Sequence, residues 1–290
     1  MEMIGGQAVI EGVMIRNKNK LATAVRTKKG IIVKKEDIHS LTEKHKLLRI
    51  PIVRGAIGLG ETMVLGIKTL NWSADLAMQD QEEQPTSNSW GLTASLIAAI
   101  IFAIAIFIFL PLWITTTFFG IEKTTATFNL VAGIIRIILF LAYIYAISFW
   151  KDVKTLFQYH GAEHKSVNCY ENEKKVNIKN TLKYSTIHNR CGTSFLLVML
   201  IIAIIGFSVI DTLVAWALGG TSLWIRLGTH ILFLPLILGV SYEIIRKAQT
   251  PNLFVKILIF PGLLLQRITT QEPTEAQIEV AIKALEAVTD

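Results

Sequence analysis

The chain has 290 residues, of which 52% are hydrophobic and 18% are charged, and its formal net charge is +7. An ordinary soluble domain has roughly 25% charged residues, so this composition excludes a disordered chain and argues against a wholly soluble protein. The positive charge does not indicate a nucleic-acid partner, because membrane proteins carry excess Lys and Arg on their cytoplasmic segments. Two cysteines in a chain of this length exclude a disulfide framework.

The N-terminal part divides into two predicted segments. Residues 1–50 read as a small cytoplasmic β-rich region, in which the runs 22–26 and 31–34 flank a glycine-containing turn and predict a hairpin. Residues 51–90 combine a helix over 52–80 with a polar linker. Four glycines weaken the helical pattern, although the same small residues would permit close packing against a membrane helix.

Long apolar segments follow, and they predict transmembrane helices because each approaches the roughly 20 residues that a bilayer demands. Between Glu83 and Glu122 there is no charged residue at all. The expected spans, with a kink at Pro111 in the first, are 92–118, 130–150, 193–218 and 223–245.

The distribution of positive charge predicts the orientation. The first 90 residues hold 13 Lys and Arg and segment 151–190 holds eight, whereas the two short connections between paired spans hold one. The positive-inside rule therefore places both termini and the 151–190 segment in the cytoplasm. The expected location is the cell (inner) membrane, and the lipid bilayer is the one partner that the sequence indicates.

The C-terminal part is expected to lie outside the bilayer core. The apolar stretch 253–265 is too short to span and is interrupted by Pro261 and Gly262, which favours an interfacial position. Ile278, Ala281, Ile282 and Leu285 then recur at helical spacing, which predicts a short soluble amphipathic helix.

These patterns predict a polytopic α-helical membrane protein of about four transmembrane helices with a small cytoplasmic α+β N-terminal region. In chain order the predicted segments are 1–50, 51–90, 91–150, 151–192, 193–245 and 246–290. The sequence does not specify the oligomeric state or a protein partner.

The polar segment between the second and third spans contains candidate metal ligands. His160 and His164 are four residues apart and face the same side of a helix. Their H-x-x-E-H pattern is that of inverted zincins, in which the glutamate, here Glu163, is the general base. His188 and Cys191 follow three residues apart. Three imidazoles and one thiolate are donors that zinc accepts, so we predict a divalent-metal site, with zinc preferred and iron as the alternative.

Two kinds of metal site fit this pattern. With all four ligands engaged, the site is closed and structural; with three ligands and a water, Glu163 would activate that water for hydrolysis of a membrane-associated substrate. Glu171 and Glu243 are further carboxylates on the same side of the membrane. Without a metal, the histidines would cap or hydrogen-bond helix ends near the bilayer, and Gly161 favours a loop or helix start there.

A second cluster lies inside the expected spans and consists of Arg136, Asp211 and Arg226. Buried ionisable groups usually pair, so Asp211 is expected to pair with one or both arginines toward the outer leaflet. The cluster is either a structural ion pair or an ion or substrate path. Rival functions are therefore a small transporter or channel, and a non-enzymatic scaffold or regulator with a structural zinc. Arg54 and Glu61 are expected on a solvated helix face.

Several segments resemble the YqhQ-like family of bacterial membrane proteins. The segments that resemble its signatures are residues 5–16 (GGQAVIEGVMIR), 159–165 (YHGAEHK), 188–195 (HNRCGTSF) and 261–267 (PGLLLQR). The resemblance covers essentially the whole chain, with Asn189 standing where a proline is expected. The family is functionally uncharacterised and is sometimes described as predicted metal-dependent enzymes. The resemblance thus implies a membrane location and, more weakly, a metal-dependent activity.

Overall fold

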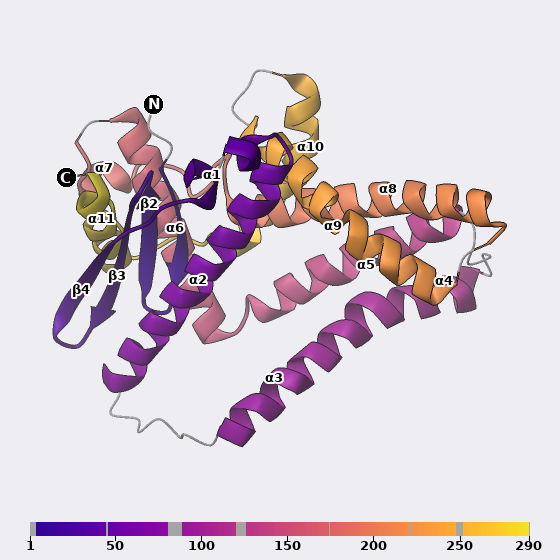
Figure 1. The fold of residues 1–290 in the computed structure, drawn as a ribbon. Coiled ribbons are helices and arrows are strands. Elements are labelled where there is room, and N and C mark those ends of the chain that lie inside the picture. The colour runs from indigo at the N-terminus through magenta and orange to yellow at the C-terminus, as the bar shows by residue number, and fades with distance from the viewer. Residues whose placement is uncertain are drawn as a thin grey trace.

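The protein is described by a computed structural model over residues 4–44, 46–80, 89–119, 126–173, 175–220, 222–247 and 252–289. Figure 1 shows a small sheet surrounded by helices at one end and long helices extending away from it. Most of the expected linker, residues 81–88, lies outside the described part.

The N-terminal residues form an antiparallel sheet whose strands are joined in chain order. The four strands in the described residues are β1 (Ile4–Val9), β2 (Gly12–Asn17), β3 (Lys20–Thr27) and β4 (Gly30–Asp37). The predicted hairpin is confirmed by the pairing of β3 with β4, which closes between Thr27 and Gly30. Gly30 has a φ of 123°, a conformation that L side chains rarely adopt.

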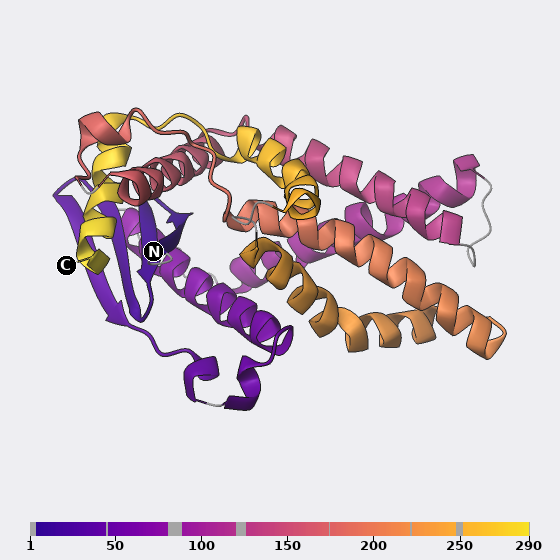
Figure 2. The ribbon, with the colours of Figure 1, turned by 90° about the horizontal axis from the view of Figure 1, so that it is seen from above.

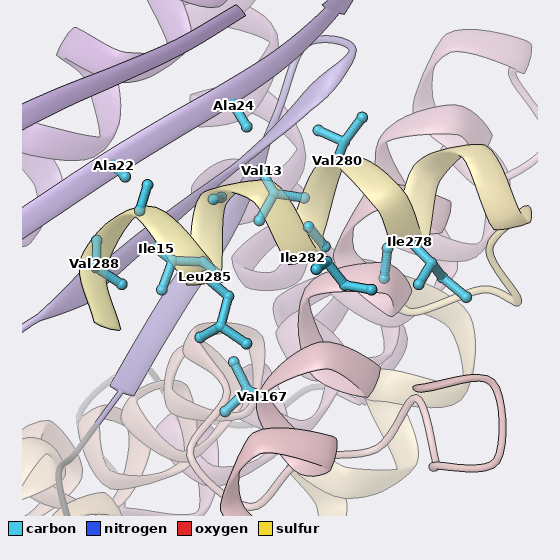
Figure 3. Close-up of a cluster of buried hydrophobic side chains, with 14 of the residues drawn as sticks. Val13, Ile15, Ala22, Ala24, Val167, Ile278, Val280, Ile282, Leu285 and Val288 are labelled. Carbon is cyan, nitrogen blue, oxygen red and sulfur yellow. The ribbon is translucent and has the colours of Figure 1, made fainter. Parts of the chain in front are cut away.

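Helices cover both faces of this sheet, as Figure 2 shows. On one face, Met14 and Leu21 pack with Trp72 of α2 (Val53–Asp80). On the other face, Val13 and Ile15 pack against α6 (Lys151–Asn172) and α11 (Glu275–Thr289), as seen in Figure 3. The expected C-terminal helix is confirmed, and its apolar side is part of the main core rather than a separate surface.

Four helices in the described residues are long and apolar enough to cross a membrane. The first span, Ile97–Phe119, comprises the second half of α3 (Ser89–Ile104), a π-helical turn η2 (Ala105–Phe109) and α4 (Leu110–Phe119). The other three spans lie in α5 (Ala126–Ile147), α8 (Gly192–Leu218) and α9 (Leu223–Arg246). The irregularity expected at Pro111 thus takes the form of a π-helical turn just before it.

Exposed aromatic side chains gather at both ends of these helices. Tyr145, Phe149 and Trp150 lie at the sheet end of α5, whereas Trp216 and Trp224 lie at the far ends of α8 and α9. Aromatic belts of this kind are typical of the two interfaces of a bilayer. Their positions agree with helices that cross a membrane.

Helix α10 (Leu253–Thr269) runs without a break through Pro261 and Gly262, so the expected interruption is wrong. Gly262 lies where α10 packs closely on α8, since a Cβ at this position would come within 2.7 Å of the Cα of Ser194. The short elements that complete the described structure are α1 (Leu41–Lys44), η1 (Lys46–Arg49) and α7 (Ile178–Thr181).

The N-terminal end of α2 is attached to α9 by small residues and an ion pair. A Cβ at Gly55 would come within 2.9 Å of the Tyr242 side chain, so the expected close packing of a glycine is confirmed against one of the membrane-length helices. Arg54 donates two hydrogen bonds of 2.7 Å to the Glu243 carboxylate. The expectation that Arg54 lies on a solvated face is therefore wrong. The Glu243 carboxylate is paired with Arg54.

Glu61, the second residue expected on a solvated face, also has a structural partner. Its carboxylate accepts hydrogen bonds from the Leu41 amide at 2.6 Å and from the Ser40 hydroxyl at 2.8 Å. It therefore holds the segment that follows β4 against α2.

We expect Gly239→Ala to lower the melting temperature of the detergent-purified protein, and Gly228→Ala on the same helix to leave it unchanged or raise it. The new methyl group at 239 would overlap the backbone of Ile52, and such overpacking costs about 1–3 kcal/mol. A Cβ at 228 has no neighbour within 4 Å. Thermal unfolding followed by circular dichroism measures both. Equal melting temperatures for the two variants would contradict this packing.

Candidate metal centre

Helix α6 places His160 and His164 one turn apart on the same side. Between them, Gly161 is buried, and a Cβ there would overlap the carbonyl oxygen of Gln271. Glycine thus allows the chain that leaves α10 to cross α6 beside the two histidines. The helix is continuous through this glycine, so the expectation of a loop or helix start at Gly161 is wrong.

Both imidazoles are oriented by backbone carbonyls. The Nδ1 of His160 lies 2.9 Å from the oxygen of Thr269, and the Nδ1 of His164 lies 2.5 Å from the oxygen of Thr186. Because a carbonyl oxygen can only accept, each Nδ1 carries a proton and donates it, which leaves Nε2 as the metal-binding nitrogen. Metal-bound histidines are commonly held by such a hydrogen bond on the second ring nitrogen.

Cys191 supplies a third donor from a distant part of the sequence. It is the N-cap residue of α8, and its Sγ lies 3.3 Å from the Nε2 of His160. Ligand atoms of His160, His164 and Cys191 all lie within 4.8 Å of one another. Ligands of a tetrahedral zinc ion are separated by roughly 3.3–3.8 Å, given bond lengths of about 2.0–2.3 Å. The three side chains therefore fit a zinc ion after small rotations.

The electrostatics of the three side chains favour the metal-binding form of the thiol. Burial by itself would raise the pKa of Cys191, but the imidazoles of His160 and His164 outweigh burial and hold this pKa well below its usual value. Burial would lower the pKa of His164, whereas the Glu163 carboxylate, Cys191 and the Thr186 carbonyl raise it to about 9. The lowered pKa of Cys191 favours the thiolate, which is the form that binds metals.

Glu163 lies beside the three donors and is covered by the N-terminal strand. Its Oε2 is 3.5 Å from the Nε2 of His164, and the residue is only 4% exposed. A Cβ at Gly6 would come within 3.0 Å of the Glu163 carboxylate, so the glycine in β1 makes room for it. Sequence reasoning assigned Gly6 no part in the site, although a glycine pair at the start of a strand was the available signal.

A further contact joins the turn after β1 to α6 close to the two histidines. The Tyr159 hydroxyl donates a hydrogen bond of 3.2 Å to the Glu11 carboxylate, and burial together with this carboxylate raises the pKa of the tyrosine. Tyr159 is 1% exposed. This contact fixes the turn between β1 and β2 against α6, on which the two histidines lie.

His188, the fourth predicted ligand, points to a different partner. Its Nε2 lies 3.4 Å from the Glu171 carboxylate, which also pairs with Arg190. Its ring centre is 5.6 Å from that of His164, and it is not part of the three-donor group. The structure thus brings together three of the four predicted ligands, and ligation by His188 stays a prediction.

Gln266 holds His188 in this position, and sequence reasoning did not select it. The buried Gln266 amide accepts from the N–H of His188 and donates to its carbonyl, both at 2.8 Å. It also donates to the Ser194 hydroxyl at 2.6 Å. The one glutamine in a mostly apolar helix was the signal that could have identified it.

The charge cluster within the spans is partly as predicted. Asp211 accepts hydrogen bonds from His230 at 3.0 Å and Asn129 at 3.3 Å, and it lies 3.8 Å from the Nε of Arg226. Arg136 instead donates to the oxygen of Phe107 at 2.8 Å.

The expected pairing of Asp211 with one of the two arginines is therefore confirmed for Arg226, whereas Arg136 has a different partner. The reason is that α5 begins at Ala126, four residues before the expected start, which places Arg136 near the middle of its span. There it meets the carbonyl of a π-helical turn, where the regular hydrogen-bond ladder is broken.

The described helices and sheet define a mostly helical protein with four membrane-length apolar helices, a small α+β part at one end, and a His/His/Cys group between the two. Residues 50–290 match the family described as "Protein of unknown function (DUF1385)". The chain is also 33% identical to "Uncharacterized protein YqhQ" of Bacillus subtilis (strain 168), over 97% of this chain and 90% of the relative. The chain therefore belongs to this family. No solved structure matches it.

Proposed function

We propose that the protein is a metal-dependent hydrolase of the bacterial inner membrane that acts on a membrane-associated substrate from the cytoplasmic side. The convergence of two Nε2 atoms and one thiolate, with the Glu163 carboxylate beside them, is the observation that supports this proposal. Three protein ligands and a free fourth position are typical of catalytic zinc sites, whereas structural sites use four. Zinc is the preferred metal and iron the alternative.

In this proposal each group at the site has a separate role. A bound zinc ion would polarise a substrate carbonyl or phosphoryl oxygen and lower the pKa of a water molecule. Glu163 takes the proton of that water and returns it to the leaving group. The carbonyls of Thr269 and Thr186 hold the two imidazoles in place, and the Thr193 N–H and hydroxyl face the thiolate at 3.4 and 3.0 Å.

The position of the site favours a substrate that arrives through the membrane surface. Its donors come from α6 and from the first turn of α8, and Thr269 lies at the last turn of α10. The site is thus at the end of the spans nearest the sheet, which the positive-inside rule assigns to the cytoplasm. A lipid or a membrane-bound peptide would meet it there.

Elemental mass spectrometry of protein purified in detergent without a histidine tag tests the metal centre. We expect about one zinc or iron ion per chain in the parent, as a single three-ligand site requires, and near none in the double variant His160→Ala/His164→Ala. His39→Ala, at an exposed histidine outside the three grouped donors, is the matched control and should retain the ion. An absence of metal in the parent after gentle purification and attempted reloading would contradict the proposal.

A second candidate function is that of a membrane scaffold or regulator with a structural zinc. It is favoured by the burial of the donors, since His164 is 1% exposed and Cys191 is 3% exposed. A metal ion at this place would join α6 of the sheet-containing part to α8 of the membrane part. Both candidates predict bound metal, so the role of Glu163 separates them.

A further inference from the structure

Helix α10 has one face packed on the bundle and one large apolar face without a protein neighbour in the described structure. On the packed face, Val255 and Ile259 lie against Val198 of α8. The side chains on the opposite face recur at intervals of four, three and four residues. They are Leu253, Ile257, Phe260 and Leu264, which are 70, 62, 56 and 42% exposed.

Two cations accompany this apolar stripe. Lys256 and Arg267 are exposed, and at about 100° per residue both fall along the same edge of the stripe. No Asp or Glu occurs between Leu253 and Thr269. An apolar stripe bordered by Lys and Arg is the pattern of helices that lie in the surface of a membrane with anionic lipids.

The position of α10 agrees with such a surface. Figures 1 and 2 show α10 beside the end of α8 that is nearest the sheet. The exposed aromatic side chains Tyr145, Phe149 and Trp150 lie at this same end of the spans. The stripe therefore lies at the same end of the spans as these aromatic side chains.

We propose that α10 is an in-plane membrane helix that inserts its apolar stripe into the leaflet nearest the sheet and binds anionic lipid headgroups through Lys256 and Arg267. The occupant of the stripe is thus the bilayer itself. The last turns of α10 carry Gln266 and Thr269, which hold His188 and His160. Seating α10 in the leaflet would fix these contacts at the membrane surface.

Spin labelling of the full chain in lipid vesicles tests the depth of α10. Both native cysteines are buried, so Phe260→Cys provides a single exposed thiol for the label. We expect the label at 260 to be accessible to oxygen and protected from a water-soluble nickel chelate. A label at Lys283→Cys on α11, where the side chain is 52% exposed, is the control and should show the reverse. Ready access of the chelate to position 260 would overturn the proposal.

Two further results would identify a different occupant of the stripe. A label at 260 that is shielded from both oxygen and the chelate would place protein there, and spin–spin broadening would identify it as a second copy of the chain. Either result would overturn insertion into lipid. Neither readout depends on bound metal, so failure of the metal-centre proposal would leave this test unaffected.

The headgroup preference is measured separately with spin-labelled phosphatidylglycerol and phosphatidylcholine. Each basic side chain at the surface is expected to contribute roughly fivefold to the preference for anionic lipid, or roughly 30-fold for the two. Lys256→Gln/Arg267→Gln should lose this part of the preference and retain the oxygen accessibility of position 260. An unchanged preference in this variant would overturn the assignment of the two side chains.

Discussion

Glu163→Gln is expected to lower hydrolysis by at least ~100-fold while leaving the metal ion bound, because a positioned general base typically contributes 10²–10⁴-fold. The substitution keeps the size of the side chain and removes its ability to take a proton. Glu163 is not one of the three grouped donors, so its loss should not release the ion. The buried position under β1 further favours a variant of unchanged shape.

This prediction is measured by elemental analysis together with turnover of fluorogenic ester, phosphodiester and peptide probes in mixed micelles. Glu171→Gln is the matched control, since Glu171 is a half-buried carboxylate that contacts His188 and Arg190 rather than the three donors. Full turnover in Glu163→Gln would refute the hydrolase proposal as stated. With metal retained, that outcome would favour the structural-zinc candidate.

Zinc affinity is expected to rise about tenfold for each pH unit between 7 and 9 and to level off above 9. The pKa of His164 is raised to about 9, so below that value the free site holds a proton that zinc must displace. Deprotonation therefore strengthens binding as the pH rises, and above 9 no proton is left to release. The pKa of the Cys191 thiol is held well below its usual value by the two imidazoles, which favours the thiolate that binds zinc.

Competition with a chelator of known zinc affinity measures this profile, after correction for the chelator's own protonation. His39→Ala is the control and should retain the slope. Glu163→Gln should move the plateau to lower pH, because the Glu163 carboxylate contributes to the raised pKa of His164. A flat profile between pH 7 and 9 would contradict the assignment of His164 as a ligand.

Features that depend on a single contiguous segment were determined by the sequence alone. Hydropathy located the four membrane-length helices, and alternation with a glycine turn located the β3–β4 hairpin. The i, i+4 spacing of His160 and His164 was enough to place both on one side of α6. These predictions succeed because bilayer thickness, strand alternation and helical periodicity act on neighbouring residues.

Contacts between distant segments were decided only by the tertiary structure. Cys191 joins the histidines because the segment after α6 returns to the start of α8, while Gln266 of α10 holds His188 on the Glu171 side. A shift of four residues in the start of α5 was enough to separate Arg136 from Asp211.

The role of the C-terminal helix was decided in the same way. The periodicity of α11 predicted an apolar face, but not that this face would cover the N-terminal sheet. The packing of α11 depends on which surfaces of the whole chain bury each other. Local sequence patterns do not contain that information. The sequence therefore determined the elements and the donor types, and packing determined which donors meet.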